Sequence, residues 1–311
     1  MKKILIVDDL HPIFIEMAEA QGYECNYQPQ YTLADTLAVI AGYEGLMVRS
    51  KFQVNKALFD AATKLQFICR AGAGMDNIDE AYARQKSIAL INAPEGNMDA
   101  VGEHAIGMLL SLMNNLNRAD AEVRNGLWKR EANRGHELKG HIVGIVGYGF
   151  MGQSFAKKLS GFGVEVIAYD KYKTGFSDRY AREVSMEEIV RQSDVLSFHV
   201  PLTKETNYLF NDELLFHFRK PFYLINTSRG KVVQTQAVLN GIKSGKILGA
   251  CLDVLEVEKF PVLGEQVWYE ELKQSGKVIL TPHVAGWTFE SYRKISEVMA
   301  EKLRDLNVDN H

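Results

Sequence analysis

The sequence has few cysteines and no long apolar run. Its three cysteines, Cys25, Cys69 and Cys251, are widely spaced in apolar segments, which argues against a disulfide or zinc framework and indicates reduced thiols. The apolar stretches at 4–7 and 108–113 are too short for a signal-peptide core or for the ~20 residues of a membrane helix. We therefore expect a cytoplasmic protein without a bound metal that is neither exported nor held in a membrane.

The sequence also lacks an excess of either charge. It has 36 Lys and Arg residues against 39 Asp and Glu residues, a formal net charge of −3, and no run of like charge. A polyelectrolyte partner is normally bound by a concentration of one charge sign. We therefore expect neither nucleic acid nor an acidic membrane surface as a partner.

Short β-branched runs alternate with helix-length segments along the whole chain. Such runs, bounded by polar or glycine turns, are typical of βαβ units and of parallel sheets that are buried on both faces. A chain of 311 residues with 46% hydrophobic content can build two domains, each with its own core. The sequence therefore predicts an α/β fold with two doubly wound parallel sheets. The runs lie at 4–7, 46–48, 67–69, 142–146, 164–169, 195–200, 223–225, 248–252 and 278–280.

Two long helices are expected near the domain boundaries. Apolar residues at helical spacing from Val101 to Leu116 predict one helix that begins near Asp99 and bridges the two sheets. A second helix is expected over 288–305, and its return to the first sheet would make that domain discontinuous. The expected domains are thus 1–98 with 287–311, and 99–286.

Asp8 and Asp9 end the first predicted strand, as paired acids do in response-regulator receiver domains. A receiver also needs a phosphate-accepting aspartate at the end of its third strand. Here the run 46–48 leads into Arg49, Ser50 and Lys51, and none of these can form an acyl phosphate. We therefore interpret the acidic pair as solvated strand-end residues.

A glycine-rich turn follows the run 142–146. Gly147, Gly149 and Gly152 form the pattern G-x-G-x-x-G ahead of a predicted helix, and the next strand ends in Asp170. The glycines permit a tight turn, close approach of the backbone to a pyrophosphate, and close packing of the helix, whose free amides hold the phosphates. A carboxylate at Asp170 accepts the ribose hydroxyls and repels a 2′-phosphate. The motif therefore predicts NAD rather than NADP, with a glycine-rich turn that binds no ligand as the alternative.

Three polar residues, Arg229, Glu258 and His283, follow predicted strands of the second sheet. In an open α/β sheet the carboxyl ends of the strands form the ligand crevice. Oxidation of an alcohol needs a base, a carboxylate anchor and a hydride acceptor, which His283, Arg229 and NAD would supply. Glu258 is expected to orient His283 and raise its pKa. A solvated histidine and a surface ion pair are the alternative interpretation.

At these positions the sequence resembles the D-isomer-specific 2-hydroxy acid dehydrogenases. The resemblance implies that Arg229 binds the substrate carboxylate and carbonyl, that His283 is the acid–base residue and that Glu258 assists it. It further implies a Rossmann NAD-binding domain, a discontinuous flavodoxin-like substrate domain, a hinged cleft and a homodimer. The matching segments are Asn226-Thr-Ser-Arg229-Gly230, Asp253-Val254 ahead of Glu258, and Thr281-Pro282-His283.

The resemblance also implies a set of cofactor contacts. Phe150 and Met151 replace the more usual Arg-Ile of the glycine loop, so somewhat weaker NAD binding is expected. The implied contacts are Gly147, Gly149, Phe150, Met151, Gly152, Asp170, His199, Val200, Pro201, Thr206, Thr227, Ser228, Asp253 and Gly286.

Within the family, the first domain looks most like the phosphoglycerate dehydrogenases, in a short form without a C-terminal regulatory domain. Arg49 and Arg70, at successive strand ends, would suit a substrate that carries a phosphate as well as a carboxylate, with Arg130 reaching across a dimer. The implied substrate contacts are Arg49, Ser50, Arg70, Ala71, Gly72, Asn97 and Arg130.

This likeness leads us to expect oxidation of 3-phospho-D-glycerate to 3-phosphohydroxypyruvate, the first step toward serine. A reductase of glyoxylate, hydroxypyruvate or another 2-keto acid is the enzymatic alternative. A non-catalytic, NAD-sensing binding module is the alternative from another functional class. Trp268 and Trp287 are expected to be core aromatics.

Overall fold

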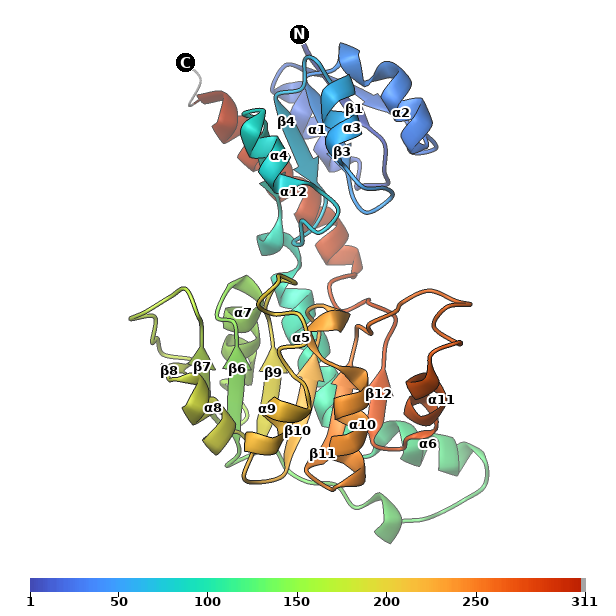
Figure 1. Cartoon of the computed structure of the whole chain (residues 1–311), viewed down its shortest axis with the longest axis vertical. Coiled ribbons are helices and arrows are strands. Elements are labelled where there is room, and N and C mark those ends of the chain that lie inside the picture. Colours follow the sequence, from blue (N-terminus) through green and yellow to red (C-terminus); the bar gives the residue numbers. More distant parts are fainter. Residues whose placement is uncertain (309–311) are drawn as a thin grey trace. The chain divides into compact units, whose positions relative to one another are not determined.

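The computed structural model of the protein describes residues 1–308. The chain forms two compact units. Met1–Met98 and the segment that begins at Trp287 make up unit 1, and Asp99–Gly286 makes up unit 2. Each unit contains one parallel sheet with helices around it, so the predicted α/β class is confirmed (Figure 1).

Unit 1 contains a five-stranded sheet in the order β2-β1-β3-β4-β5, and all of its printed strand pairs are parallel. Successive side chains of β1 enter different cores, because Ile4 and Ile6 face one side of the sheet and Leu5 faces the other. The strands are β1 (Lys2–Ile6), β2 (Tyr23–Tyr27), β3 (Gly45–Val48), β4 (Phe67–Arg70) and β5 (Ala89–Asn92). The helices are α1 (Ile13–Ala20), α2 (Leu33–Val39), α3 (Lys56–Ala61), α4 (Glu80–Gln85) and α12 (Phe289–Val308).

Unit 2 contains a seven-stranded sheet in the order β12-β11-β10-β9-β6-β7-β8. Its first strand, β6, lies between β9 and β7, so the chain order reverses there and creates the point at which such sheets bind ligands. The strands are β6 (Ile142–Val146), β7 (Glu165–Tyr169), β8 (Arg182–Glu183), β9 (Val195–Phe198), β10 (Phe222–Asn226), β11 (Ile247–Leu252) and β12 (Val278–Leu280). The helices are α5 (Pro94–Met113), which begins in unit 1, α6 (Leu116–Arg124), α7 (Phe150–Leu159), α8 (Met186–Gln192), α9 (Asp212–His217), α10 (Thr235–Lys243) and α11 (Val267–Gln274).

The bounds predicted for the bridging helix were wrong. The helix α5 begins at Pro94, because the fixed φ of proline suits the first helical turn and its missing N–H costs nothing there. It ends at Met113, and Asn115 then adopts a left-handed conformation with φ 54°. Leu116 therefore belongs to α6, where it is exposed, and not to the apolar stripe of α5.

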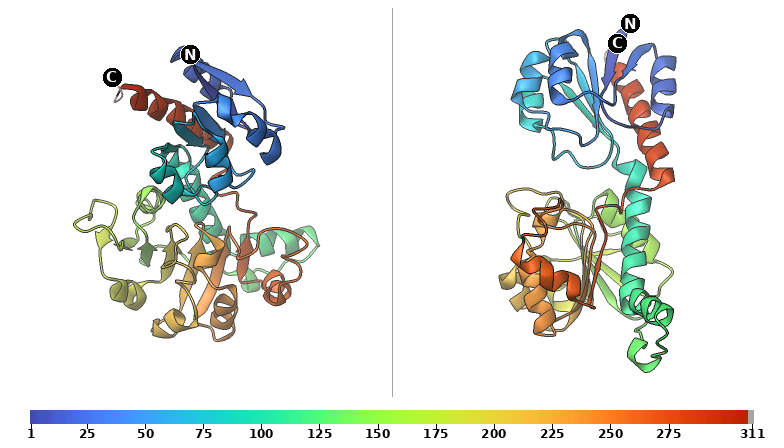
Figure 2. Two further views of the ribbon diagram at one scale, coloured as in Figure 1. Left: turned by 45° about the horizontal axis from the view of Figure 1, so that its top comes forward. Right: turned by 90° about the vertical axis from the view of Figure 1, so that its right-hand side faces the viewer.

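The C-terminal helix α12 packs within unit 1 (Figure 2). Ile295, Met299 and Leu303 enter the same core as Ile4 and Ile6 of β1. At Gly96, in the first turn of α5, a Cβ atom would come within 2.6 Å of the Ile295 backbone, so only glycine permits this close approach.

Residues 1–308 include no helix that is both long and apolar enough to cross a membrane.

Candidate coenzyme and active site

The glycine turn between β6 and α7 leaves room for a ligand at one position and none at the other two. A Cβ atom on Gly147, where φ is 94°, would come within 2.5 Å of a backbone oxygen, and one on Gly152 would overlap the Gly147 carbonyl. A Cβ atom on Gly149 would meet no atom within 4 Å. Gly149 is also the N-cap of α7, so the first amides of that helix point toward this space. The geometry fits a dinucleotide pyrophosphate.

Asp170, directly after β7, lies beside this turn. One of its carboxylate oxygens accepts a hydrogen bond from the Tyr148 amide at 2.9 Å, and the other accepts one from the Tyr172 amide at 3.0 Å. Each oxygen retains a lone pair. The carboxylate is thus held at the chain reversal and can accept further hydrogen bonds from ribose hydroxyls.

The loops after β9 and β10 contain buried polar atoms without a hydrogen-bond partner among the described residues: Nδ1 of His199 and Oγ1 of Thr227. Nε2 of His199 lies 2.8 Å from the Ser197 hydroxyl, and burial lowers the pKa of the ring to about 3, so the ring is neutral. Buried polar groups are usually satisfied by protein, water or a ligand. These two atoms therefore fit a site that a polar ligand completes.

The residues predicted to contact the cofactor all follow the carboxyl ends of strands in unit 2. The Thr206 hydroxyl donates a 2.6 Å hydrogen bond to the carbonyl of Pro201, and the Ser228 hydroxyl donates one of 2.7 Å to the Asn226 side chain. By strand, the residues are Gly147, Gly149, Phe150, Met151 and Gly152 after β6; Asp170 after β7; His199, Val200, Pro201 and Thr206 after β9; Thr227 and Ser228 after β10; Asp253 after β11; and Gly286 after β12.

Arg229, Glu258 and His283 follow β10, β11 and β12, which are neighbours in the sheet. Nδ1 of His283 lies 2.9 Å from a carboxylate oxygen of Glu258, and this hydrogen bond raises the pKa of His283 against the opposing effect of burial. The positive charge of Arg229 acts on the same ring and lowers its pKa. Because Nδ1 donates to the carboxylate, Nε2 is the atom that can exchange a proton with a substrate.

The buried carboxylate of Asp253 holds the loop that carries His283. It accepts hydrogen bonds from the Thr281 hydroxyl at 2.6 Å and from the amides of Val284 and Ala285 at 2.9 and 3.0 Å. The His283 amide donates to the Asp253 carbonyl, and His283 adopts a left-handed φ of 54°. With 1% of its surface exposed, Asp253 here binds the protein's own groups.

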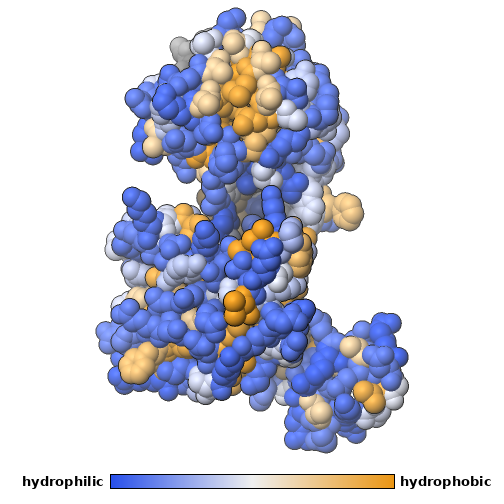
Figure 3. Space-filling view, turned by 45° about the vertical axis from the view of Figure 1, so that its right-hand side comes forward, coloured by the Kyte–Doolittle hydropathy of each residue, from blue (hydrophilic) through white to orange (hydrophobic). Residues whose placement is uncertain are grey.

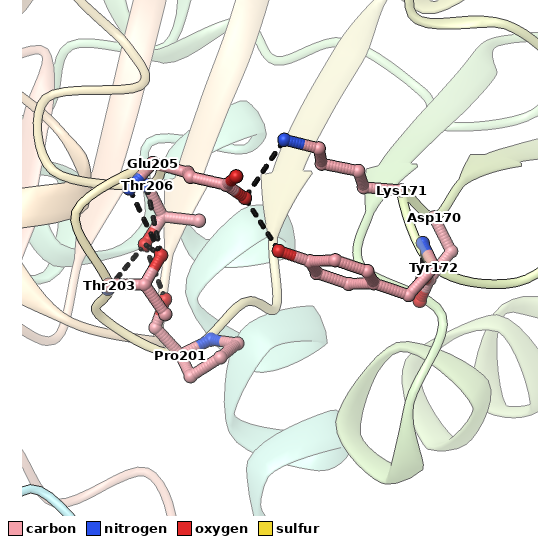
Figure 4. A network of polar contacts seen from close by, with 7 residues as sticks. All are labelled: Asp170, Lys171, Tyr172, Pro201, Thr203, Glu205 and Thr206. Carbon is pink, nitrogen blue, oxygen red and sulfur yellow. Dashed lines mark hydrogen bonds and ion pairs between the residues drawn. The ribbon is translucent and has the colours of Figure 1, made fainter.

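Sequence reasoning did not find two further polar groups of this unit. His104 of α5 places Nε2 3.0 Å from the Thr281 hydroxyl and 3.6 Å from Asp253. Glu205, in the loop after β9, contacts Lys171 and Tyr172, which follow Asp170 (Figure 4). Neither residue lies in a motif. Only the pairing of distant segments brings them to the site.

The predicted substrate residues of unit 1 lie at or just after the ends of β3 and β4 or in the first turns of α5. Arg49 stacks on the ring of Trp287, with 3.5 Å between the guanidinium carbon and the ring centroid, and burial lowers the pKa of its guanidinium. Ser50 follows Arg49, whereas Arg70, Ala71 and Gly72 continue from β4. Oδ1 of Asn97 is buried without a hydrogen-bond partner among the described residues.

Arg130 differs from these residues because it is exposed in unit 2, just before the short 3-10 helix 131–133.

Two interpretations of unit 1 were wrong. Asp8 is not simply solvated, because one of its oxygens accepts the amides of Arg49, Ser50 and Lys51 at 3.0–3.1 Å. The parallel pairing of β1 with β3 places residue 8 beside this turn. Trp287 is not a core aromatic, because 41% of its surface is exposed and Arg49 covers its ring. Trp268, in contrast, packs against the core of unit 2.

Among the described residues, no group of three or more His, Cys, Asp or Glu side chains is arranged to hold a metal ion.

Comparison with known proteins identifies a family whose sequences this chain matches. Residues 106–285 match the model of the D-isomer specific 2-hydroxyacid dehydrogenase, NAD binding domain. The chain is 34% identical over 269 residues to a hydroxypyruvate reductase of Thermotoga maritima, a match that covers 86% of each protein. It is 34% identical over 279 residues to a D-3-phosphoglycerate dehydrogenase of Bacillus subtilis, which covers 88% of this chain but 51% of that protein.

Solved structures agree with this relationship. The D-lactate dehydrogenase of Aquifex aeolicus, complexed with NAD and lactic acid, superposes with a TM-score of 0.82 at 26% identity, covering 99% of this chain and 96% of that one. The present chain thus spans nearly all of one dehydrogenase and about half the length of the matched phosphoglycerate dehydrogenase.

Proposed function

Because the chain belongs to the D-isomer specific 2-hydroxyacid dehydrogenases, we propose that it oxidises 3-phospho-D-glycerate at C2 with NAD, giving 3-phosphohydroxypyruvate. This would be the first step toward serine. NAD-dependent dehydrogenation of a D-2-hydroxy acid is the activity of the family, and the phosphorylated substrate is the finer part of the proposal. The observation that carries the reaction is the hydrogen-bonded pair of His283 and Glu258, with Arg229 on the neighbouring strand end.

In the proposed mechanism, the amides at the start of α7 would hold the pyrophosphate of NAD and Asp170 would hold its adenosine ribose. NAD, when bound, supplies the acceptor for the hydride that leaves C2. Arg229 binds the substrate carboxylate, which fixes the hydroxyl relative to the histidine. Nε2 of His283 accepts the hydroxyl proton, and the Glu258 carboxylate stabilises the resulting imidazolium.

Two arginines of unit 1 support the phosphorylated substrate. Arg49 follows β3 and Arg70 ends the neighbouring parallel strand β4, so both arginines lie at the carboxyl end of the sheet. Stacking on Trp287 occupies the face of the Arg49 guanidinium, whereas oxyanions bind along its N–H edge. The proposal therefore assigns the substrate phosphate to Arg49 and Arg70.

A reductase of hydroxypyruvate is the second candidate. The match to the Thermotoga maritima hydroxypyruvate reductase covers 86% of that protein, a larger share than the match to the phosphoglycerate dehydrogenase. The same three residues would then work in the reverse direction, with protonated His283 as the acid.

We also propose that the protein is a homodimer formed through α6 and the chain that follows it. In this segment Leu116, Val123, Leu127 and Trp128 are exposed, and Trp128 retains 80% of its surface. Figure 3 shows apolar residues gathered at the top of the view and otherwise scattered among polar ones. Light scattering should give twice the chain mass, and Trp128→Asp should shift the protein toward monomer. A monomeric wild-type protein would contradict this assembly.

The substrate is tested by initial rates with 3-phosphoglycerate and phosphohydroxypyruvate beside D-lactate, glyoxylate and hydroxypyruvate, each with NAD(H) and NADP(H). Arg70→Met should raise KM for phosphohydroxypyruvate by about 10-fold or more, the cost of a lost charged hydrogen bond, and leave glyoxylate reduction nearly unchanged. Arg84→Met, at an exposed arginine of α4, is the matched control.

Equal losses on both substrates in the Arg70 variant would refute the phosphate assignment. A wild-type preference for hydroxypyruvate would favour the second candidate. NADH binding without turnover on any acid would contradict both and favour an NAD-sensing role.

A further inference from the structure

A polar cluster lies beside Asp170 and has no part in the proposed mechanism (Figure 4). One carboxylate oxygen of Glu205 lies 2.9 Å from the Lys171 ammonium and accepts a hydrogen bond of 2.5 Å from the Tyr172 hydroxyl. We call these three residues the Glu205 cluster. It joins the loop after β9 to the loop after β7, and the Tyr172 amide also donates to Asp170.

The position of Glu205 is set by a tight turn. The Thr203 hydroxyl accepts the amides of Glu205 and Thr206, both at 3.2 Å, and the Thr206 hydroxyl accepts the amide of Thr203 at 2.8 Å. The Thr206 hydroxyl then donates to the carbonyl of Pro201. These local bonds hold Glu205 toward the end of β7, across the intervening strand β6.

The charges in the cluster bear on the choice of coenzyme. Lys171 directly follows Asp170, so its long, flexible side chain can reach a phosphate on a ribose that Asp170 holds. The hydrogen bond to Glu205 raises the pKa of Lys171, while the bonds from Tyr172 and Lys171 lower the pKa of Glu205. Both groups are therefore charged at neutral pH, and Glu205 engages the ammonium.

We propose that Glu205 is a specificity-determining residue that holds Lys171 away from the 2′-phosphate of NADP(H). Asp170 repels that phosphate, and Glu205 engages the Lys171 cation that would compensate for the repulsion. Preference for NAD(H) then depends on two carboxylates from different loops, Asp170 and Glu205. The inference rests on the placement of the adenosine ribose beside Asp170 that was proposed above.

The test measures direct binding of NADH and NADPH to the purified protein. Binding is monitored by coenzyme fluorescence without any substrate. Glu205→Gln should improve NADPH binding relative to NADH by about two- to five-fold, the scale of one exposed charged contact. The gain should shrink in high salt. The double variant Lys171→Ala with Glu205→Gln should lose it. Glu187→Gln, at an exposed glutamate of α8, controls for the loss of one negative charge.

An unchanged ratio in Glu205→Gln would overturn the proposal, and so would a gain that survives in the double variant, because Lys171 would then have no part in it. Asp170→Ala tests the ribose placement separately. If Asp170→Ala binds NADH and NADPH as the wild type does, the proposed placement of the ribose beside Asp170 is wrong. If Asp170→Ala changes coenzyme binding and Glu205→Gln does not, that placement stands and only the role of Glu205 is refuted.

Discussion

Replacement of Asp253 by Asn tests whether one buried carboxylate maintains the geometry of His283. The wild-type side chain accepts three hydrogen bonds, two of them from the amides that follow His283. Asparagine keeps one oxygen and turns an NH2 group toward a donor, so one buried N–H loses its acceptor at a cost of about 1–3 kcal/mol. His283 adopts a left-handed backbone conformation, which costs of order 1–3 kcal/mol relative to an ordinary one. The variant has fewer hydrogen bonds to maintain that conformation.

We therefore expect Asp253→Asn to lose roughly 1–3 kcal/mol of unfolding free energy from the unpaired N–H, which is about 2–12 °C in Tm for a unit of this size. Backbone strain that the loop releases at His283 offsets part of this loss. Because the loop would relax, kcat should fall by about 10-fold or more, with little change in NADH affinity. Calorimetry and fluorescence titration measure the two effects.

Asp212→Asn, at an exposed carboxylate of α9, is the control. An unchanged Tm together with weakened NADH binding would refute the loop argument and assign Asp253 to the coenzyme.

Three other substitutions are expected to act on single steps. In Glu258→Gln the pKa of His283 should fall, because the Glu258 carboxylate raises it in the wild type. Oxidation, which needs neutral His283, should then persist to lower pH. Reduction needs the protonated ring, so its rate should begin to fall with rising pH at a lower pH than in the wild type; unshifted pH–rate limbs would contradict this. Gly147→Ala should weaken NADH binding about 10-fold or more in fluorescence titration, because the new Cβ would lie 2.5 Å from a backbone oxygen at a positive φ; wild-type affinity would contradict it. Trp287→Leu should raise KM for phosphohydroxypyruvate by about 2- to 30-fold, the scale of a cation–π contact, and spare glyoxylate; equal effects in steady-state assays would remove Arg49 from phosphate binding.

The central strands could be predicted from the sequence, whereas the edge strands β2, β5 and β8 could not. The runs that predicted β1, β3 and β4 are continuous and apolar because those strands are covered on both faces. In unit 1 the strands β2 and β5 form the sheet edges, and β2 has the partly polar sequence Tyr-Glu-Cys-Asn-Tyr. In unit 2 the edge strand β8 has two residues, Arg182 and Glu183. Edge strands need only one neighbour and partial cover, so β2 and β8 leave no apolar run. The edge strand β12, with the sequence Val-Ile-Leu, could be predicted.

The chemistry-bearing residues of unit 2 could be located because parallel strands deliver their carboxyl ends to one edge. Arg229, Glu258 and His283 each follow a different strand, and that alone predicts that they gather. The contacts that orient them could not be inferred in this way. His104 reaches Thr281 from a helix, and the interaction depends on how α5 packs on the sheet.

Carboxylates at strand ends illustrate what separates a predictable role from an unpredictable one. Asp8, Asp170 and Asp253 all follow parallel strands, and each accepts backbone amides. The amides that donate to Asp8 and Asp253 belong to loops after neighbouring strands. Because almost every residue has a backbone amide, no pattern of side chains in the sequence predicts these hydrogen bonds. Exposure distinguishes Asp253 from Asp170. Asp253 is buried and its known contacts are internal, whereas Asp170 remains half-exposed beside an open glycine turn, which is the condition for a carboxylate to meet a ligand.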